Sequence, residues 1–401
     1  MKAMKRGAAV LFFCLSPLCA QVRWQEWGPA PITNGPFTGR VSALAASPKD
    51  PNLLYAAGAD GGVWRTRDGG RHWTPLTDRL PTTAMGALAL DPTNEKVIYA
   101  GSGEPNFANH SRYGLGLYKS TDGGDHWEVL AEDTFGGRCI SGIAVDPKNP
   151  KVLYVSLAAA GGFPALVAAR GHKGAKGPLG LFKSTDGGRT FVQLKNGLPA
   201  TLSAFDVRLD PADPRIVYVA VGHIFGDSRN GVYRSTDGGA SFVKLGGGLP
   251  ASGVGRIALA VAPSRPGRVY ALVARACSST GGGGSTLGGW RTDDYGKKWV
   301  SIHPGSMQAT YGWYLCVATV SPKNPALVFF GGFSIRRSSN AGAGWTTRTA
   351  PHVDNHAFAW DAAGRLIVGC DGGVFRSANN GDSWSSINGD LGVVQCYAGI
   401  S

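Results

Sequence analysis

The sequence has few charged side chains and few helix-favouring stretches, and both shortages narrow the class of protein. Only 17% of the residues are charged, whereas 43% are hydrophobic and 10% are aromatic, a composition that excludes a disordered chain. The 401 residues include 60 glycines and 24 prolines, which interrupt helices and favour turns. These features exclude a helical bundle and predict a globular, turn-rich protein.

Clustered positive charge is also missing. The formal net charge is +13, from 40 basic and 27 acidic residues. The basic residues are spread thinly, however, and form no run comparable to a nucleic-acid-binding arm. We therefore expect no nucleic-acid partner.

Cysteine pairs at metal-binding spacing are absent. No C-x-x-C motif occurs, which argues against a zinc knot. Beyond the first twenty residues the cysteine number is odd, so at most two disulfides can form within one chain. We expect no cofactor. The cysteines in question are Cys139, Cys277, Cys316, Cys370 and Cys396.

The N-terminus is typical of a secretory signal peptide, which we assign to residues 1–20. It combines a basic start, an apolar stretch, a breaker and a final small residue: Lys2, Lys5 and Arg6, then residues 8–15, Pro17 and Ala20. Such a segment is removed on export, and no later stretch is long and apolar enough to span a bilayer. We expect a secreted or periplasmic protein without a membrane span.

A repeated segment organises the rest of the chain. Residues 65–73, 119–127, 183–191 and 234–242 are nearly the same sequence, and degenerate copies occupy 291–299, 337–345 and 376–384. The copies recur about every 52 residues, a spacing typical of propeller blades. Each copy is preceded by a strand of alternating pattern and a β-branched strand, joined by a turn that usually contains proline, as in residues 88–99 and 207–218.

Each unit therefore predicts four antiparallel strands. Four strands repeated seven times predict an all-β, seven-bladed β-propeller over residues 21–392. In each unit the repeated segment forms the turn between the third and fourth strands. Residues 393–401 resemble a further first strand, which either helps to close the ring or begins another blade of a longer protein.

The segments with the pattern S/T-x-D-G-G-x-x-W/F resemble the Asp-box, or BNR, repeat. That repeat occurs in sialidases, sortilin-type receptor domains, xyloglucanase-type glycoside hydrolases and other secreted bacterial propellers. The resemblance covers nearly all of residues 24–392 and implies the fold far more strongly than any activity. Three copies depart from it, with Tyr295, Ala341 and Asn380 in place of the first glycine, and we expect looser turns there.

Two aspartates are candidate catalytic residues. Asp60 and Asp371 each precede a Gly-Gly pair at the same position in the first and seventh units, which are neighbours in a seven-membered ring. Glycoside hydrolysis requires two carboxyl groups across a groove. Asp60 also resembles the Asp-x-Gly-Gly segment of xyloglucanase-type propellers, where a catalytic aspartate lies, although those enzymes form their cleft between two propellers. The alternative is that both aspartates cap tight turns.

Loops between the second and third strands share one face of a propeller with the links between blades, and this face is the expected ligand surface. Aromatic side chains there suit stacking on sugar rings, although they could instead fill the space between blades. The candidate ligand-binding residues are Glu104, His110, Arg112, Tyr113, Tyr311, Trp313 and Tyr314.

A third candidate is a metal site at His352, Asp354 and His356. Their spacing of two places all three side chains on one side of an extended strand, and imidazole with carboxylate suits a divalent ion. The alternative is a hydrogen-bonded cluster at the start of a strand.

The sequence thus predicts a secreted β-propeller that binds an extracellular polysaccharide or polypeptide on its loop-rich face. The alternative is a glycoside hydrolase of the xyloglucanase-like type that uses the paired aspartates. The sequence leaves the oligomeric state open.

Overall fold

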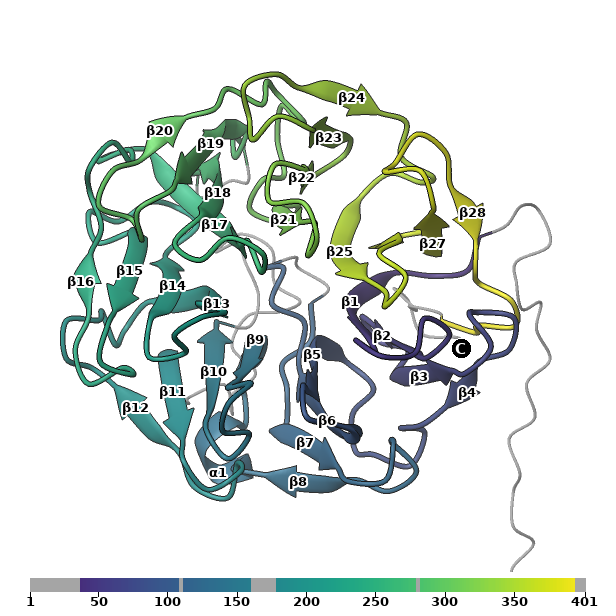
Figure 1. Cartoon of the computed structure of the whole chain (residues 1–401). Helices are drawn as coiled ribbons and strands as arrows, with labels where there is room; N and C mark the ends of the chain where they lie inside the picture. The colour runs from purple at the N-terminus through teal and green to yellow at the C-terminus, as the bar shows by residue number, and fades with distance from the viewer. Residues whose placement is uncertain (1–36, 108–110, 160–177, 279–281, 394–401) are drawn as a thin grey trace, which may run out of the picture.

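The computed structural model describes residues 37–107, 111–159, 178–278 and 282–393. They form seven four-stranded antiparallel sheets arranged as blades around a central axis (Figure 1). Within every blade the four strands follow one another in chain order, from the axis to the rim. The predicted all-β, seven-bladed propeller is therefore confirmed.

The strands of each blade are as follows, from the axis outwards. The first four blades comprise β1 (Val41–Ala46), β2 (Leu54–Gly58), β3 (Val63–Thr66) and β4 (Thr74–Pro75); β5 (Met85–Asp91), β6 (Asn94–Ser102), β7 (Leu117–Ser120) and β8 (Glu128–Leu130); β9 (Cys139–Val145), β10 (Leu153–Ala158), β11 (Gly180–Ser184) and β12 (Val192–Leu194); and β13 (Ser203–Leu209), β14 (Val217–Gly222), β15 (Gly231–Ser235) and β16 (Val243–Lys244). The last three comprise β17 (Val254–Val261), β18 (Val269–Arg275), β19 (Thr286–Thr292) and β20 (Val300–Ser301); β21 (Val317–Val320), β22 (Val328–Gly331), β23 (Ile335–Ser338) and β24 (Thr346–Arg348); and β25 (Asn355–Trp360), β26 (Leu366–Cys370), β27 (Gly373–Ser377) and β28 (Ser385–Ser386). A single turn of helix, α1 (Glu132–Phe135), precedes the third blade.

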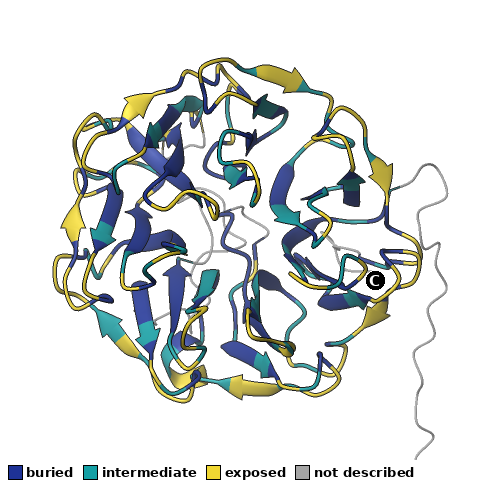
Figure 2. Cartoon of the chain, viewed as in Figure 1, coloured by how far each residue is buried: buried dark blue, intermediate teal, exposed yellow. Residues whose placement is uncertain are grey.

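Burial falls from the axis to the rim, as Figure 2 shows. The second strand of most blades is almost entirely buried, and β6 of the second blade is buried from Ile98 onwards. The short fourth strands are exposed or half-buried. Cores form between neighbouring blades: Tyr55 and Val63 of the first blade pack with Met85, Ile98 and Tyr118 of the second. Runs of β-branched and aromatic residues in the inner strands account for this, because both faces of each inner strand are covered by adjacent blades.

The repeated turn is held by a buried hydroxyl and an aspartate on the rim. In the third blade Ser184 is 1% exposed, accepts a hydrogen bond from the Gly188 N–H at 2.9 Å and donates one to Asp186 at 2.8 Å. Asp186 also accepts hydrogen bonds from the Thr190 hydroxyl and backbone N–H, and these bonds hold its pKa well below the usual range. Asp68, Asp122 and Asp237 occupy equivalent outer turns.

The three degenerate turns are not looser, contrary to expectation. Tyr295, Ala341 and Asn380 adopt the left-handed conformation that glycine adopts elsewhere, with φ of 64°, 59° and 58°. The buried hydroxyl still accepts its hydrogen bond from the following glycine, at 2.9, 2.8 and 2.7 Å respectively. The side-chain hydrogen bonds therefore outweigh the cost of a left-handed residue, which is of order 1–2 kcal/mol.

Only some of the predictions about the chain ends and the cysteines concern residues that the structure describes. The signal peptide and nearly all of residues 393–401 lie outside the described residues, although Val393 is buried against the first blade. Cys139, Cys277, Cys316 and Cys370 are buried free thiols, so no disulfide joins them. Cys396 lies outside the described residues. No helix in the described part of the chain is long and apolar enough to cross a membrane.

The buried hydroxyl of the turn makes a testable contribution to stability. Replacing it in Ser184→Ala leaves the Gly188 N–H without its acceptor, and we expect a loss of about 1–3 kcal/mol in the free energy of unfolding. Urea denaturation measures this change. The matched control is Ser228→Ala, an exposed position, which should change stability by less than about 0.5 kcal/mol. Equal effects of the two substitutions would contradict the role given to Ser184.

Candidate functional site

Irregular pairing at the start of the inner strands determines which side chains reach the mouth of the channel. The register between the first and second strands shifts at Ser42 in the first blade, around Arg256 in the fifth and at His356 in the seventh. A β-bulge of this kind inserts an extra residue and redirects its side chain. The bulges thus place Arg256 and His356 where a regular strand would not.

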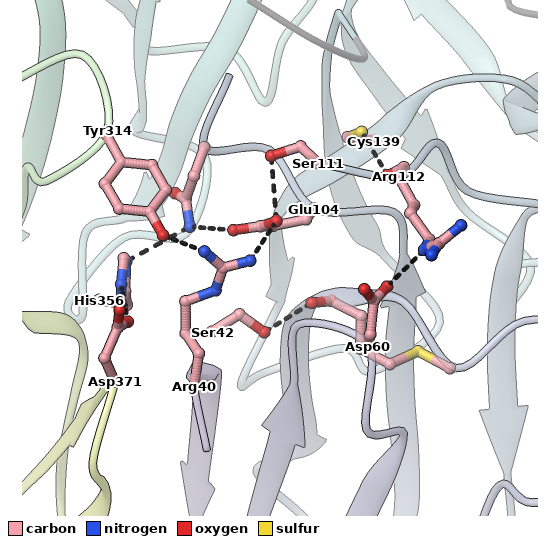
Figure 3. Close-up of polar contacts among 12 residues, drawn as sticks. Arg40, Ser42, Asp60, Glu104, Ser111, Arg112, Cys139, Tyr314, His356 and Asp371 are labelled. Carbon is pink, nitrogen blue, oxygen red and sulfur yellow. Dashed lines mark hydrogen bonds and ion pairs between the residues drawn. The ribbon is translucent and has the colours of Figure 1, made fainter. Parts of the chain in front are cut away.

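The loop between β6 and β7 reaches over the channel and is fixed there by a buried ion pair (Figure 3). Glu104 Oε2 lies 2.9 Å from Arg40 Nη2, and the two side chains are 0% and 3% exposed. Ser111 donates a second hydrogen bond to the same carboxylate at 3.0 Å. Glu104 was predicted to contact ligand, but its carboxylate is buried and paired, so it positions the loop instead.

Asn106 extends this network across the channel to two distant blades. Its amide nitrogen lies 3.1 Å from Glu104 Oε1 and 3.4 Å from His356 Nδ1. Its oxygen accepts a hydrogen bond from Arg256 Nη1 at 3.0 Å. This loop thereby links the second blade to the fifth and the seventh.

Asp371 lies directly after β26 and belongs to the same network. Its Oδ1 is 2.8 Å from Nε2 of the buried His356, while its own side chain remains 30% exposed. Burial raises the pKa of Asp371, but the hydrogen bond from His356 and the positive charges of His356 and Arg40 outweigh that effect, and the pKa lies below its usual range. Asp371 is therefore held in its ionised form and remains accessible.

Asp354, in the link that enters β25, has the opposite electrostatics. Burial, followed by the negative charge of Asp371, raises the pKa of Asp354. Its Oδ1 is buried and makes no hydrogen bond within the described part of the chain. The backbone is left-handed there, with φ of 62°, a conformation that costs energy in a residue other than glycine. Two nearby carboxyl groups with pKa values shifted in opposite directions are typical of an acid–base pair.

Asp60 occupies the position in the first blade that Asp371 occupies in the seventh. Its Oδ1 lies 3.1 Å from Arg112 Nε, and its side chain is 11% exposed. In Figure 3 Asp60 points towards Arg112, and Asp371 points towards His356. The structure therefore brings the two predicted catalytic aspartates to the same face, but each has a different partner.

The aromatic candidates divide into one exposed and two buried side chains. Tyr311 is 44% exposed and packs edge-on against Phe333, with ring centroids 5.7 Å apart. Trp313 and Tyr314 are buried, and Tyr314 packs edge-on against His356 with centroids 4.9 Å apart. Tyr311 is thus the one of the three that presents a ring to solvent.

The remaining candidates are placed as follows. Tyr113 is half-buried beside the exposed Arg112, and His110 lies outside the described residues. Across the described residues, no group of three or more His, Cys, Asp or Glu side chains is placed to hold a metal ion. His352, Asp354 and His356 are therefore not gathered as metal ligands, and His356 is instead engaged by Asp371 and Asn106.

The sequence interpretation missed three residues of the network: Arg40, Asn106 and Arg256. A signal for the two arginines was available, because each follows a glycine at the start of an inner strand, in Gly39-Arg40 and Gly255-Arg256. Asn106 carries no comparable local signal, because the two partners that it joins across the channel, Arg256 and His356, are 150 and 250 residues away.

The buried ion pair should be costly to break. Glu104→Ala leaves Arg40 buried without its carboxylate, and we expect a loss of about 3–5 kcal/mol in the free energy of unfolding. The control is Asp125→Ala, which removes a 55%-exposed carboxylate from an ion pair with Arg65 and should cost no more than about 1 kcal/mol. Denaturant titration of both variants provides the comparison, and similar losses would show that the pair is not a structural contact of the loop.

Comparisons with known proteins were made on the sequence and on the fold. No protein-family model matches the chain. The chain is 23% identical to the xyloglucanase Xgh74A of Acetivibrio thermocellus over 365 residues, which cover 80% of this chain and 39% of that protein. It is 26% identical to a xyloglucanase of Hypocrea jecorina over 347 residues, covering 77% and 37% respectively. The chain thus spans less than two fifths of either relative.

Solved structures share the fold at lower identity. The GH74 enzyme of Niastella koreensis superposes with a TM-score of 0.64 at 20% identity, over 88% of this chain and 54% of that one. A structure of YCF48 bound to D1 peptide gives a TM-score of 0.53 at 13% identity, over 85% of this chain and 94% of that one. At these identities the likeness concerns the propeller fold.

Proposed function

We propose that this protein is a glycoside hydrolase that acts on an extracellular β-glucan of the xyloglucan class. One observation carries the proposal: Asp371 is held ionised on the loop-bearing face, and the charge of Asp371 helps to raise the pKa of Asp354. The similarity to xyloglucanases favours hydrolysis over binding alone.

In this proposal Asp371 is the ionised carboxylate, which acts as base or nucleophile, and a second carboxyl group protonates the departing sugar oxygen. Two residues are candidates for this proton donor. Burial and the charge of Asp371 raise the pKa of Asp354, which is the direction that favours a proton donor. Asp60 occupies the equivalent position in the neighbouring blade. The aromatic pair of Tyr311 and Phe333 supplies an exposed ring on which a sugar could stack.

A pure binding function is the second candidate, and the exposed ring of Tyr311 favours it because this feature requires no catalysis. Its ligand would be an extracellular polysaccharide or polypeptide. The structural likeness to YCF48 bound to D1 peptide is compatible with a polypeptide ligand. Turnover separates the two candidates, because a binding protein releases its glycan unchanged.

The hydrolase proposal predicts new reducing ends when the purified protein is incubated with xyloglucan. Asp371→Asn should lower kcat about 100-fold to 10,000-fold, because it removes a charged group that takes part in proton transfer or attack. Asp382→Asn is the control, since Asp382 is half-exposed and pairs with Arg337 and Arg348 on the rim. A wild-type protein that binds xyloglucan without cleaving it would favour the binding function.

The pH profile identifies the proton donor. Activity should fall as the pH drops through the lowered pKa of Asp371, because the ionised form is lost, and fall again as the pH rises through the raised pKa of the donor. If Asp354 is the donor, Asp354→Asn should remove the alkaline limb together with most of kcat, whereas Asp60→Asn should leave both limbs in place. The reverse pattern would assign the role to Asp60.

A further inference from the structure

A cavity of about 170 Å³ lies in the central channel, beneath the loop that carries Asn106. The inner strands of all seven blades line it. Its polar lining includes Ser141, Asp206, Arg208, Arg256 and His356. The loop between β6 and β7 also contributes to the lining, through Pro105 and Asn106.

Arg256 is a buried cation without a carboxylate partner in the described part of the chain. The residue is 8% exposed. Its Nη1 donates to Asn106 Oδ1 at 3.0 Å and to the carbonyl oxygens of Trp313 and Tyr314 at 3.1 and 3.0 Å. Within that part of the chain, Nε and Nη2 make no hydrogen bond and no acidic side chain forms an ion pair with the guanidinium. Burial lowers the pKa of Arg256, as expected for a charge removed from water.

The charges of Asp206, in the cavity lining, and of Glu104 raise the pKa of Arg256 but do not outweigh its burial, and each carboxylate forms its ion pair with another arginine. Asp206 Oδ1 lies 3.0 Å from Arg208 Nε. Asp206 Oδ2 accepts the Leu259 N–H at 2.9 Å. Asp206 and Arg208 therefore balance each other, and Arg256 leaves the cavity lining with one surplus positive charge.

We propose that the channel cavity binds a small carboxylate through the Nε–Nη2 edge of Arg256. These two nitrogens present parallel N–H groups that match the two oxygens of a carboxylate. A ligand of this charge gives the buried cation an ion-pair partner, which no acidic side chain of the described residues supplies. The proposal does not rest on the glycoside hydrolase activity, because Asp60, Asp354 and Asp371 are not among the residues that line the cavity.

The side of the cavity away from the Asn106 loop adjoins a groove on the opposite face of the propeller. A groove of about 440 Å³ on that face is lined by Pro48, Pro263, Lys323 and Trp360. The groove shares Arg208 and Ala318 with the cavity lining, so the two spaces are adjacent. Arg208, Lys323 and Asp361 line this groove. Arg208 pairs with Asp206 and Asp361 pairs with Arg365, so Lys323 supplies the positive charge that favours the approach of an anion.

Acetate is the probe that tests the proposal. Sodium acetate should raise the Tm of the wild-type protein by a few degrees relative to sodium chloride at equal ionic strength and pH, because it binds the folded state. Arg256→Gln should abolish the difference between the two salts. Arg265→Gln, which changes a half-exposed arginine away from the cavity, should retain it. Equal Tm values in the two salts for the wild-type protein would overturn the proposal.

A second measurement covers the case in which Arg256→Gln does not fold. Crystals of the wild-type protein are soaked in acetate or in chloride, and the density beside Arg256 is compared. A planar carboxylate within hydrogen-bond distance of Nε and Nη2 supports the proposal. Water or chloride alone at that position, in both soaks, would overturn it.

Discussion

The buried ion pair between Arg40 and Glu104 is the contact on which the loop-bearing face depends. It joins the residue that precedes β1 to the loop that follows β6, and both side chains are removed from water. Such a pair contributes little net stability, but losing one partner leaves a costly buried charge. With Glu104 fixed, Asn106 reaches both His356 and Arg256. The ion pair thus determines where the groups around Asp371 lie.

Bulged inner strands give the repeated blade its local differences. Every blade supplies the same four-stranded sheet, yet the irregular residue is a serine in the first blade, an arginine in the fifth and a histidine in the seventh. A bulge redirects one side chain, and regular pairing with the second strand resumes beyond it. The propeller can therefore vary the chemistry at the channel mouth blade by blade while the hydrophobic contacts between blades remain similar.

The fold could be predicted from the sequence because its information is local and repeated: a buried hydroxyl, an aspartate, glycines and an aromatic residue recur in each turn. Asp371 could be selected because a Gly-Gly pair follows it. Its electrostatics could not be predicted, since they depend on His356 and on Arg40, which is more than 300 residues away in the chain. Glu104 shows a related difficulty: a polar residue in a long loop suggests exposure, and only the fold shows that its side chain is buried.

The chain order of the strands has a consequence for the continuity of the backbone. Because each blade is made of four consecutive strands, the links between blades carry no hydrogen bond of any sheet ladder. The exposed link between β16 and β17 contains Gly246 and Gly253, around which a side chain would meet no neighbouring atom. A protease that cuts this link would leave every sheet intact, and the two pieces would stay associated through the packing of the fourth blade on the fifth. The ring of blades can therefore remain closed after the backbone has been cut.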